Sequence, residues 1–243
     1  MDGQHVSPGI DADQRGFGDA DSLLEEFAAV IAHELATPLS IIEMAVQTAL
    51  RNDGASSQIG HREVLEMVER NVKLAQLLVN RLTLSRDVEA DTFVLDLASV
   101  DLAELVQEAV ADLGPVVMTD NPVAVTVESS PTITADSTAV REIVFNLLSN
   151  ACKYSEKGAA IEVTVRIAGA MAEVVVRNHG SGVAPGDTDA IFEKFHRGDT
   201  DAPGAGLGLF ISRGLARAHG GDLTVQAAEH VGSEFCLTLP LDD

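Results

Sequence analysis

The chain has 243 residues, enough for one large domain or two modest ones, and its 46% of hydrophobic residues can build a real core. Because aromatic residues make up only 4% and tryptophan is missing, that core must be mainly aliphatic. Sixteen Lys and Arg oppose 38 Asp and Glu, and the formal net charge of −22 argues against a protein that binds nucleic acid or an anionic membrane. Nine of the basic residues fall between Arg141 and Arg217, which leaves room for a local anionic ligand.

The two cysteines, Cys152 and Cys236, each lie inside an apolar pattern. They predict buried free thiols in a reducing compartment rather than a disulfide framework. No run of about 18 apolar residues occurs, and residues 1–16 contain no apolar signal core. We therefore expect a soluble, cytoplasmic chain without a membrane segment, which is also compatible with a piece of a longer membrane protein.

A long amphipathic helix is expected near the N-terminus. Residues 1–20 are rich in Gly, Asp and Gln and predict a disordered lead-in. Asp21 can cap a helix that continues to about Arg51. Pro38 falls inside this helix and cannot donate to the carbonyl of Glu34, so a bend is expected there. The apolar residues at helical spacing form one stripe: Leu24, Phe27, Ile31, Leu35, Ile42 and Ala49.

A second amphipathic helix is expected over residues 61–88, after a turn at 52–57. Two such helices make an antiparallel hairpin that leaves a hydrophobic seam uncovered. Pairing with a second copy covers the seam and gives a four-helix bundle, so we predict a homodimer through residues 21–90. The stripe of the second helix is Val64, Val68, Val72, Ala75, Leu78 or Val79, and Leu82.

His33 projects from the polar face of the first helix, roughly 200° from its apolar neighbours Ile31 and Leu35. Glu34 is adjacent in sequence and Thr37 is one turn further on, so the three polar side chains can share one solvent-facing neighbourhood. A lone helical histidine is usually solvated and inert. A zinc site of the H-E-x-x-H type fails because Thr37 stands where the second ligand is needed.

Beyond Ala90 the pattern changes to short strands with helices between them, which predicts an α/β sandwich over residues 91–243. Seven glycines between residues 180 and 208 predict a mobile loop rather than core. The complete chain is therefore expected to be α+β, a helical hairpin followed by a sandwich. The expected strands are 92–97, 123–127, 132–134, 161–167, 171–177, 223–227 and 234–239, and the expected helices are 101–113, 136–155 and 206–218.

A second group of polar residues lies on the helix expected at 136–155. Asn146, Asn150 and Lys153 are spaced four and three apart, so they share one face, where amide oxygens suit a hydrated Mg²⁺ and the ammonium suits a phosphate. The same face could also be simply polar. Two glycine clusters follow, at residues 180–182 and 204–208, and the second opens a helix whose N-terminal amides can accept phosphate. Neither cluster fits the P-loop or dinucleotide-binding fingerprints.

Taken together, these stretches resemble the cytoplasmic core of two-component sensor histidine kinases over about residues 21–240. FAAVIAHELATPLSII is similar to the family's phosphoacceptor box and REIVFNLLSNACKYS to its Asn box. VRNHGSGV, IFEKFHRG and GAGLGLFIS are similar to its first Gly box, Phe box and second Gly box. The resemblance implies a dimeric phosphoacceptor hairpin at residues 21–90 and a Bergerat-type ATP-binding sandwich at 91–243.

The resemblance also implies roles for individual residues. His33 would accept the γ-phosphoryl group of ATP, Glu34 would polarise or deprotonate its ring, and Thr37 would serve in dephosphorylating the partner. Asn150 would coordinate Mg²⁺, and the phosphoryl group would finish on an aspartate of a response regulator. The residues implied to bind the nucleotide are Asn146, Asn150, Lys153, Tyr154, Asn178, Gly180, Gly182, Phe192, Phe195, Arg197, Gly204, Gly206, Leu207, Gly208 and Leu209.

Three residues depart from the family's common pattern. Asn178 stands where an Asp usually accepts the adenine amino group, Ala36 replaces a frequent Arg, and His196 replaces a frequent Tyr. An asparagine still accepts with its carbonyl oxygen but lacks the charge, so binding weaker than usual is expected. Two alternatives follow: a catalytically silent scaffold for a response regulator, and a hydrolytic Bergerat-fold ATPase. The hydrolase would need a glutamate base where this chain has Asn146.

Overall fold

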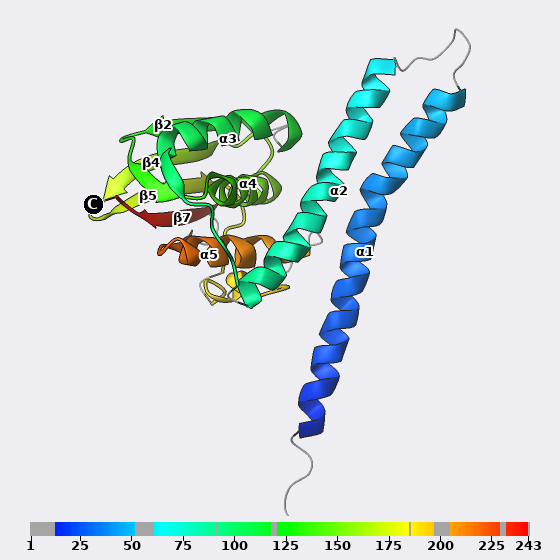
Figure 1. Ribbon diagram of the computed structural model, residues 1–243, viewed down its shortest axis with the longest axis horizontal. Helices are drawn as coiled ribbons and strands as arrows, with labels where there is room; N and C mark the ends of the chain where they lie inside the picture. The colour runs from blue at the N-terminus through cyan, green and yellow to red at the C-terminus, as the bar shows by residue number, and fades with distance from the viewer. Residues whose placement is uncertain are drawn as a thin grey trace, which may run out of the picture. The chain divides into compact units, whose positions relative to one another are not determined.

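The computed structural model describes residues 13–51, 61–90, 92–117, 121–184, 186–196, 205–228 and 232–242. The chain divides into two compact units, Met1–Leu78 and Val79–Asp243, and each is described by itself (Figure 1). Across the described residues, no helix is both long enough and apolar enough to span a membrane.

The first unit is a helical hairpin, made by α1 (Asp13–Arg51) and the first part of α2 (His61–Glu89). On α1 the buried side chains recur every seven residues, at Ile31, Pro38 and Ala45, and on α2 Val64 and Asn71 repeat this spacing. A seven-residue spacing is typical of a narrow seam between two helices. The helix continues through Pro38, where no backbone hydrogen bond to the carbonyl of Glu34 can form.

The start of α1 differs from the prediction. Its backbone is helical from Asp13, eight residues before the predicted cap at Asp21. The polar composition of residues 13–20 disfavours burial in a core. A helix that has already formed can nevertheless extend into them, because adding one residue to a helix costs much less free energy than starting a new one. Residues 1–12 and the predicted turn at 52–57 lie outside the described residues.

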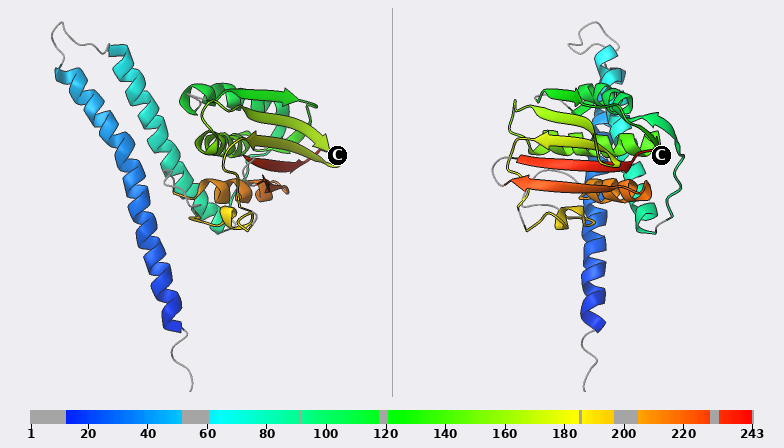
Figure 2. Two further views of the ribbon diagram at one scale, coloured as in Figure 1. Left: turned by 180° about the vertical axis from the view of Figure 1, so that it is seen from behind. Right: turned by 90° about the vertical axis from the view of Figure 1, so that its left-hand side faces the viewer.

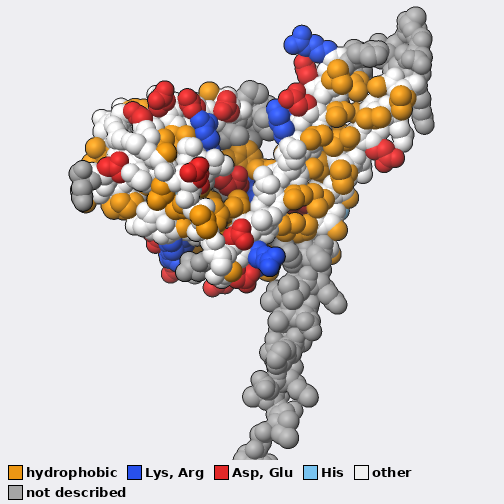
Figure 3. All heavy atoms as spheres, viewed as in Figure 1, with side chains coloured by type: hydrophobic (Ala, Val, Ile, Leu, Met, Phe, Trp, Pro, Cys, Tyr) orange, Lys and Arg blue, Asp and Glu red, His pale blue; other side chains and the backbone are white. Residues whose placement is uncertain are grey.

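Hydrophobic side chains remain exposed along the hairpin, where Figure 3 shows them in orange. Leu50 is 73% exposed and Leu65 is 68% exposed. Scattered apolar residues are normal on a protein surface, whereas these residues occur along both helices of the hairpin. The exposed large residues of the hairpin unit are Leu39, Met44, Val46, Leu50, Leu65, Val72 and Leu74.

The second unit is an α/β sandwich whose main sheet has the order β2-β4-β5-β7-β6. β2 (Val123–Val127) pairs with β4 (Ile161–Ala168) in parallel, and the other pairs are antiparallel. β4 and β5 (Met171–Asn178) form the predicted hairpin, followed in the sheet by β7 (Gly232–Pro240) and β6 (Asp222–Ala228). β1 (Ala98–Asp101) and β3 (Thr132–Ala135) form a separate antiparallel pair.

Three helices cover one face of the main sheet: α3 (Leu102–Val117), α4 (Ser137–Tyr154) and α5 (Gly208–Ala218) (Figure 2). Alternate residues of each strand point to this face, so the core forms between the sheet and the helices. Its fully buried members include Val163, Val174 and Leu237 from the strands. They pack with Leu147 and Ile211 from the helices, which gives the aliphatic core expected from the composition.

Two sequence predictions in this unit are wrong. Residues 92–97 form no strand, because the amide of Asp96 donates to the carboxylate of Asp136 over 3.0 Å and the next strand begins only at Ala98. The glycine-rich segment was expected to lie outside the core, yet Phe192 is 6% exposed and Leu207 is 2% exposed. Phe192 ends η1 (Ala190–Phe192), a single 3₁₀ turn whose length is too short to give a periodic signal.

Candidate nucleotide site

The helix α4 carries the three predicted polar residues along one face, with increasing exposure toward its C-terminus. Asn146 is 2% exposed, Asn150 is partly buried and Lys153 is exposed. Asp136 caps the helix, because its Oδ1 accepts hydrogen bonds from the amides of Thr138 at 2.9 Å and Ala139 at 3.1 Å. The cap fixes the start of α4 and therefore the direction in which the three side chains point.

Asn146 is held by hydrogen bonds on both atoms of its side-chain amide. Its Nδ2 lies 3.1 Å from Ser212 Oγ and 3.4 Å from the carbonyl oxygen of Gly208, both on α5. The same nitrogen lies 3.4 Å from Glu142 Oε1, and Asn146 Oδ1 accepts from Arg81 Nη2. The side chain thus joins α4 to α5, and both of its polar atoms already have partners.

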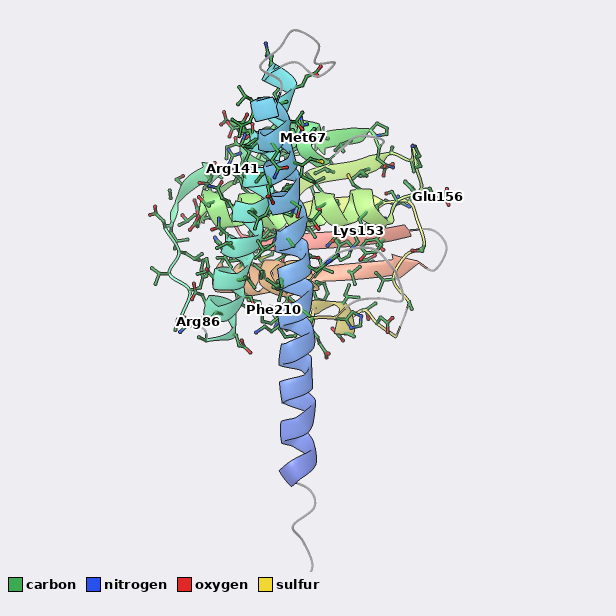
Figure 4. All side chains as sticks on the ribbon, turned by 90° about the vertical axis from the view of Figure 1, so that its right-hand side faces the viewer. Met67, Arg86, Arg141, Lys153, Glu156 and Phe210 are labelled. Atoms are coloured by element: carbon green, nitrogen blue, oxygen red, sulfur yellow. The ribbon has the colours of Figure 1, made fainter. Side chains whose placement is uncertain are left out.

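The C-terminal end of α4 meets the end of β5. Gly180 pairs with Ser155, and a Cβ on Gly180 would lie 1.8 Å from the carbonyl oxygen of Tyr154, so only glycine fits there. Lys153 Nζ lies 5.0 Å from the centre of the Tyr154 ring. Figure 4 labels Lys153 at this end of α4, with Glu156 just beyond it. The Asn box and the first Gly box therefore meet at one edge of the sandwich.

Asn178 ends β5 and is 3% exposed. Its Nδ2 is buried and has no hydrogen-bond partner. A buried, unpaired amide N–H costs free energy, so such a group in a native protein requires an explanation. A ligand that supplies the missing acceptor is one explanation, and such a contact would add to the predicted one, in which the side-chain oxygen of Asn178 accepts from the base.

The Phe box packs onto the segment that leads into α5. Phe195 has a φ of 69°, unusual for any residue but glycine, and its amide donates to the carbonyl of Gly206 over 3.0 Å. The ring of Phe192 lies 4.6 Å below the guanidinium carbon of Arg213. Burial raises the pKa of Asp222, but hydrogen bonds from Arg213, the Leu223 amide and Arg217 outweigh it, and the pKa stands below its ordinary value.

The N-terminus of α5 can hold an anion. Its N-cap residue is Leu207, which makes no side-chain capping bond, so the first amides of the helix are not satisfied by a cap. Unsatisfied amides at a helix N-terminus, together with the helix dipole, attract phosphate groups. Gly208, Leu209 and Phe210 form this first turn, and Figure 4 labels Phe210 there.

The predicted phosphoacceptor residues lie on α1, in the other unit. His33 and Thr37 are exposed and Glu34 is partly buried, and Thr37 Oγ1 donates to the carbonyl of His33 over 3.1 Å. The described residues thus place Asn146, Lys153, Tyr154, Gly180 and Leu207–Leu209 around α4 and α5, with Asn178, Gly182, Phe192, Phe195 and Gly206 on the adjoining strand end and loop. Arg197 and Gly204 lie outside the described residues.

Sequence reasoning missed three residues around Asn146: Arg81, Glu142 and Ser212. Burial raises the pKa of Glu142 above its ordinary value, although Arg81 and Asn146 stabilise its ionised form. Ser212 is fully buried on the apolar face of α5, and Arg81 interrupts the apolar pattern of α2. The sequence signal that could have found these residues is a polar side chain at a position that the helical period assigns to the core.

Within the described residues, no group of three or more His, Cys, Asp or Glu is arranged to hold a metal ion.

The fold and the site define a class, an ATP-binding sandwich that follows a phosphoacceptor hairpin. Residues 135–243 match the family described as histidine kinase-, DNA gyrase B- and HSP90-like ATPases, and residues 23–89 match the His Kinase A (phospho-acceptor) domain. The chain is 31% identical to the mycobacterial sensor histidine kinase MprB, over 60% of this chain and 97% of that one, with a TM-score of 0.54. This chain belongs to the sensor histidine kinases.

Two further relatives cover both units. The sensor-like histidine kinase SenX3 of Mycobacterium tuberculosis is 30% identical over 239 residues, which are 94% of this chain and 56% of SenX3. The crystal structure of full-length ShkA in complex with AMPPNP is 30% identical, with a TM-score of 0.64 over 89% of this chain and 46% of that one. The chain therefore spans about half the length of such relatives.

Proposed function

We propose that this chain is the kinase core of a two-component sensor, which transfers the γ-phosphoryl group of ATP to His33 and then to an aspartate of a response regulator. One observation carries the proposal. The part of the chain that matches the phosphoacceptor domain contains the exposed His33, and the part that matches the ATPase family contains Asn146, Asn150 and Lys153 on α4. The silent-scaffold and hydrolase alternatives have no observation in their favour.

The nucleotide would be ATP, held by groups whose chemistry fits its parts. The unpartnered Nδ2–H of Asn178 suits an acceptor on the base, and the exposed ammonium of Lys153 and the uncapped N-terminus of α5 suit the phosphates. Asn150 would hold Mg²⁺ by its side-chain oxygen, with phosphates and water as the other ligands. The ion would neutralise negative charge on the phosphates.

At His33 the chemistry is a phosphoryl transfer. A ring nitrogen attacks the γ-phosphorus, the N–P bond forms, and the bond to the bridging oxygen of ADP breaks. Glu34, next in sequence, would take or polarise the proton on the other ring nitrogen, which makes the imidazole a better nucleophile. The phosphoryl group then passes from nitrogen to a carboxylate oxygen of the regulator, and Thr37 would position water when the regulator is dephosphorylated.

The assembly would be a homodimer held by residues 21–90. The exposed apolar residues of the hairpin support it, because burying them at about 25 cal/mol per Å² is the main driving force available. Sedimentation of two fragments, residues 21–90 and 91–243, tests the assignment. The first fragment should dimerise and the second should not, and the reverse result rejects this interface.

Labelling with γ-³²P-ATP and Mg²⁺ tests the function. The protein should acquire an acid-labile, alkali-stable phosphoryl group, and His33→Gln should abolish it while nucleotide affinity changes less than about twofold. His61→Gln, which removes a histidine from the other helix of the hairpin, is the matched control and should label normally. Persistent labelling of the His33 variant would exclude His33 as the acceptor, and an unlabelled wild type would reject the kinase itself.

A further inference from the structure

The C-terminal end of α2, residues 79–89, packs within the second unit, although the rest of α2 belongs to the first. We call these residues the docked end of α2. Three contacts hold it. Arg81 reaches Glu142 and Asn146 on α4, Val88 packs on Gly214 of α5, and Glu89 pairs with Lys194 of the Phe box.

Arg81 makes the contact that bears on the nucleotide site. Its Nε lies 3.3 Å from Glu142 Oε1, and the two side chains are only 19% and 16% exposed. Its guanidinium carbon lies 5.4 Å from the centre of the Phe145 ring, and its Nη2 donates to Asn146 Oδ1. A guanidinium bonded to a carboxylate and an amide oxygen in a partly dry site forms hydrogen bonds stronger than those between neutral groups.

The consequence for Asn146 is that both polar atoms of its side-chain amide are engaged. Its oxygen accepts from Arg81, its nitrogen faces Ser212, Gly208 and Glu142, and the residue is 2% exposed. A magnesium-bound water that donates to the oxygen must compete with the Arg81 guanidinium, whereas a phosphate oxygen could only accept from the nitrogen. The guanidinium is the partner whose removal frees the oxygen, because the others bond the nitrogen.

The other two contacts support the same arrangement from α5 and the Phe box. A Cβ on Gly214 would lie 2.2 Å from Val88 Cγ1, so Val88 sits in a gap that only a glycine leaves open. Lys194 Nζ lies 2.6 Å from Glu89 Oε2. The docked end of α2 therefore touches α4, α5 and the Phe box, which carry Asn146, Gly208 and Phe195 among the candidate nucleotide residues.

We propose that the docked end of α2 is a latch on the nucleotide site: Arg81 holds Asn146 in a closed arrangement, and docking and Mg-nucleotide binding compete. The proposal rests on the proposed function and on the predicted role of Asn146 as a nucleotide-binding residue. Since binding would draw only on the undocked fraction, the apparent Kd is the intrinsic Kd divided by that fraction. Any change that undocks α2 should tighten nucleotide binding without touching the nucleotide residues.

The first experiment removes the guanidinium from the full-length chain and titrates Mg-AMPPNP by calorimetry. Arg81→Met should bind roughly 5- to 20-fold tighter, as expected when a charge-assisted contact no longer holds the closed state. Arg81→Lys keeps the charge beside Glu142, so its affinity for Mg-AMPPNP should lie between those of the wild type and Arg81→Met. Arg86→Met, which removes an exposed arginine from the same helix, is the matched control and should bind as the wild type does.

A double variant guards against misfolding. Arg81→Met leaves the Glu142 carboxylate buried without its cation, which is costly. The double variant Arg81→Met/Glu142→Gln removes both charges, and its affinity for Mg-AMPPNP should increase as much as that of Arg81→Met.

The second experiment undocks α2 by steric means and leaves Arg81 in place. Gly214→Ala inserts a methyl group against Val88, so it should tighten Mg-AMPPNP binding in the same direction as Arg81→Met. Val88→Ala/Gly214→Ala removes the clashing methyl groups and should return the affinity toward the wild-type value. This reversal is not expected if Gly214→Ala acts only by stabilising α5.

The outcomes separate the latch from its alternatives. Weaker binding by Arg81→Met would make Arg81 a phosphate ligand, and unchanged binding in both the Arg81 and Gly214 variants would leave only a structural contact. Either result overturns the latch while nucleotide binding, and with it the proposed function, stands. Failure of the wild type and every variant to bind nucleotide, with His33 unlabelled, would reject both proposals together.

Discussion

Gly206 lies directly against the backbone of Phe195. A Cβ added to Gly206 would stand 2.7 Å from the Phe195 carbonyl carbon and 2.8 Å from the His196 carbonyl oxygen, and the φ of Gly206 is +66°. Phe195 itself holds a φ of 69°. The junction between the Phe box and the start of α5 therefore needs two residues with positive φ, Phe195 and Gly206.

Gly206→Ala should destabilise the second unit by a few kcal/mol, because the new methyl group adds a backbone clash to a left-handed φ. Urea unfolding followed by circular dichroism measures it. Two glycines separate the causes. Gly158 has a φ of +82° with nothing within 4 Å of its Cβ position, so Gly158→Ala should cost about 1 kcal/mol. Gly186 also has nothing within 4 Å of its Cβ position and does not have a left-handed φ, so Gly186→Ala should lower the free energy of unfolding by less than Gly158→Ala does. Equal losses at Gly206 and Gly158 would show that the contact with Phe195 is unimportant.

The elements of the sandwich could be predicted because their signals are local. Asp136 before an apolar helical repeat marked the start of α4, and Gly169 between two alternating stretches marked the β4–β5 hairpin. The same locality explains the failures. The segment at 92–97 has strand-like composition, but its Asp96 amide bonds a side chain 40 residues away. No periodicity within the segment contains that information.

The candidate site also has a part that local sequence signals predict and a part that they do not. The Asn-box face and the glycine clusters follow from spacing along one element, and in the structure Asn146 Nδ2 lies 3.4 Å from the carbonyl oxygen of Gly208. Arg81 lies 65 residues from Asn146 in sequence, and Ser212 lies 66 residues from it. Such contacts depend on how α2 and α5 pack against α4, which a single sequence does not specify.

Asp136 should make the stability of the second unit depend on pH. Burial raises the pKa of Asp136, but hydrogen bonds from the amides of Asp96, Ala139 and Thr138 outweigh it and hold the pKa below its ordinary value. A lowered pKa in the folded state means that this stability is complete above the unfolded pKa and is lost as pH falls through the folded pKa. The loss attributable to Asp136 therefore begins near pH 4 and grows below it.

The measurement compares Asp136→Asn with the wild type by urea unfolding from pH 7 down to pH 3. An asparagine caps almost as well but lacks the charge, so it should cost about 0.5–1 kcal/mol at pH 7. That difference should shrink toward zero as the wild-type carboxyl protonates. Asp136→Ala loses the cap altogether and should cost about 1–2 kcal/mol at every pH above 4. A pH-independent gap between the Asn variant and the wild type would mean that the charge contributes nothing.

Asn150 should be required for magnesium-dependent transfer but not for folding. It is partly buried one turn beyond Asn146 on α4, so Asn150→Ala should leave the helix and the sandwich intact. Labelling of His33 should fall by about 100-fold, because loss of even an outer-shell partner of a metal costs roughly 10- to 100-fold. Ser149→Ala, on the same turn of α4, is the matched control and should label normally. Undiminished labelling of the Asn150 variant would remove this residue from the metal site.

Asn178→Asp should trade stability for nucleotide affinity. The side chain is 3% exposed, so a carboxylate there is buried and should lower the midpoint of thermal unfolding without nucleotide. The same substitution removes the unpartnered Nδ2–H and supplies a charged acceptor for the exocyclic amine of adenine. Hydrogen bonds to a charged acceptor are about twice as strong as those to a neutral one, so Mg-ATP should bind tighter by about 1 kcal/mol, or roughly fivefold.

Titration of the wild type, Asn178→Asp and Asn178→Ala with ATP and GTP decides how the base is read. The carboxylate only accepts hydrogen bonds, whereas the amide can both donate and accept, so the Asp variant should discriminate against GTP more strongly than the wild type does. The Ala variant should bind both nucleotides more weakly than either. If the Asp variant instead binds ATP more weakly, the Nδ2–H must itself donate to the bound base. The unpartnered nitrogen of Asn178 would then be half of a two-point contact with adenine, and the asparagine would be the better residue for ATP.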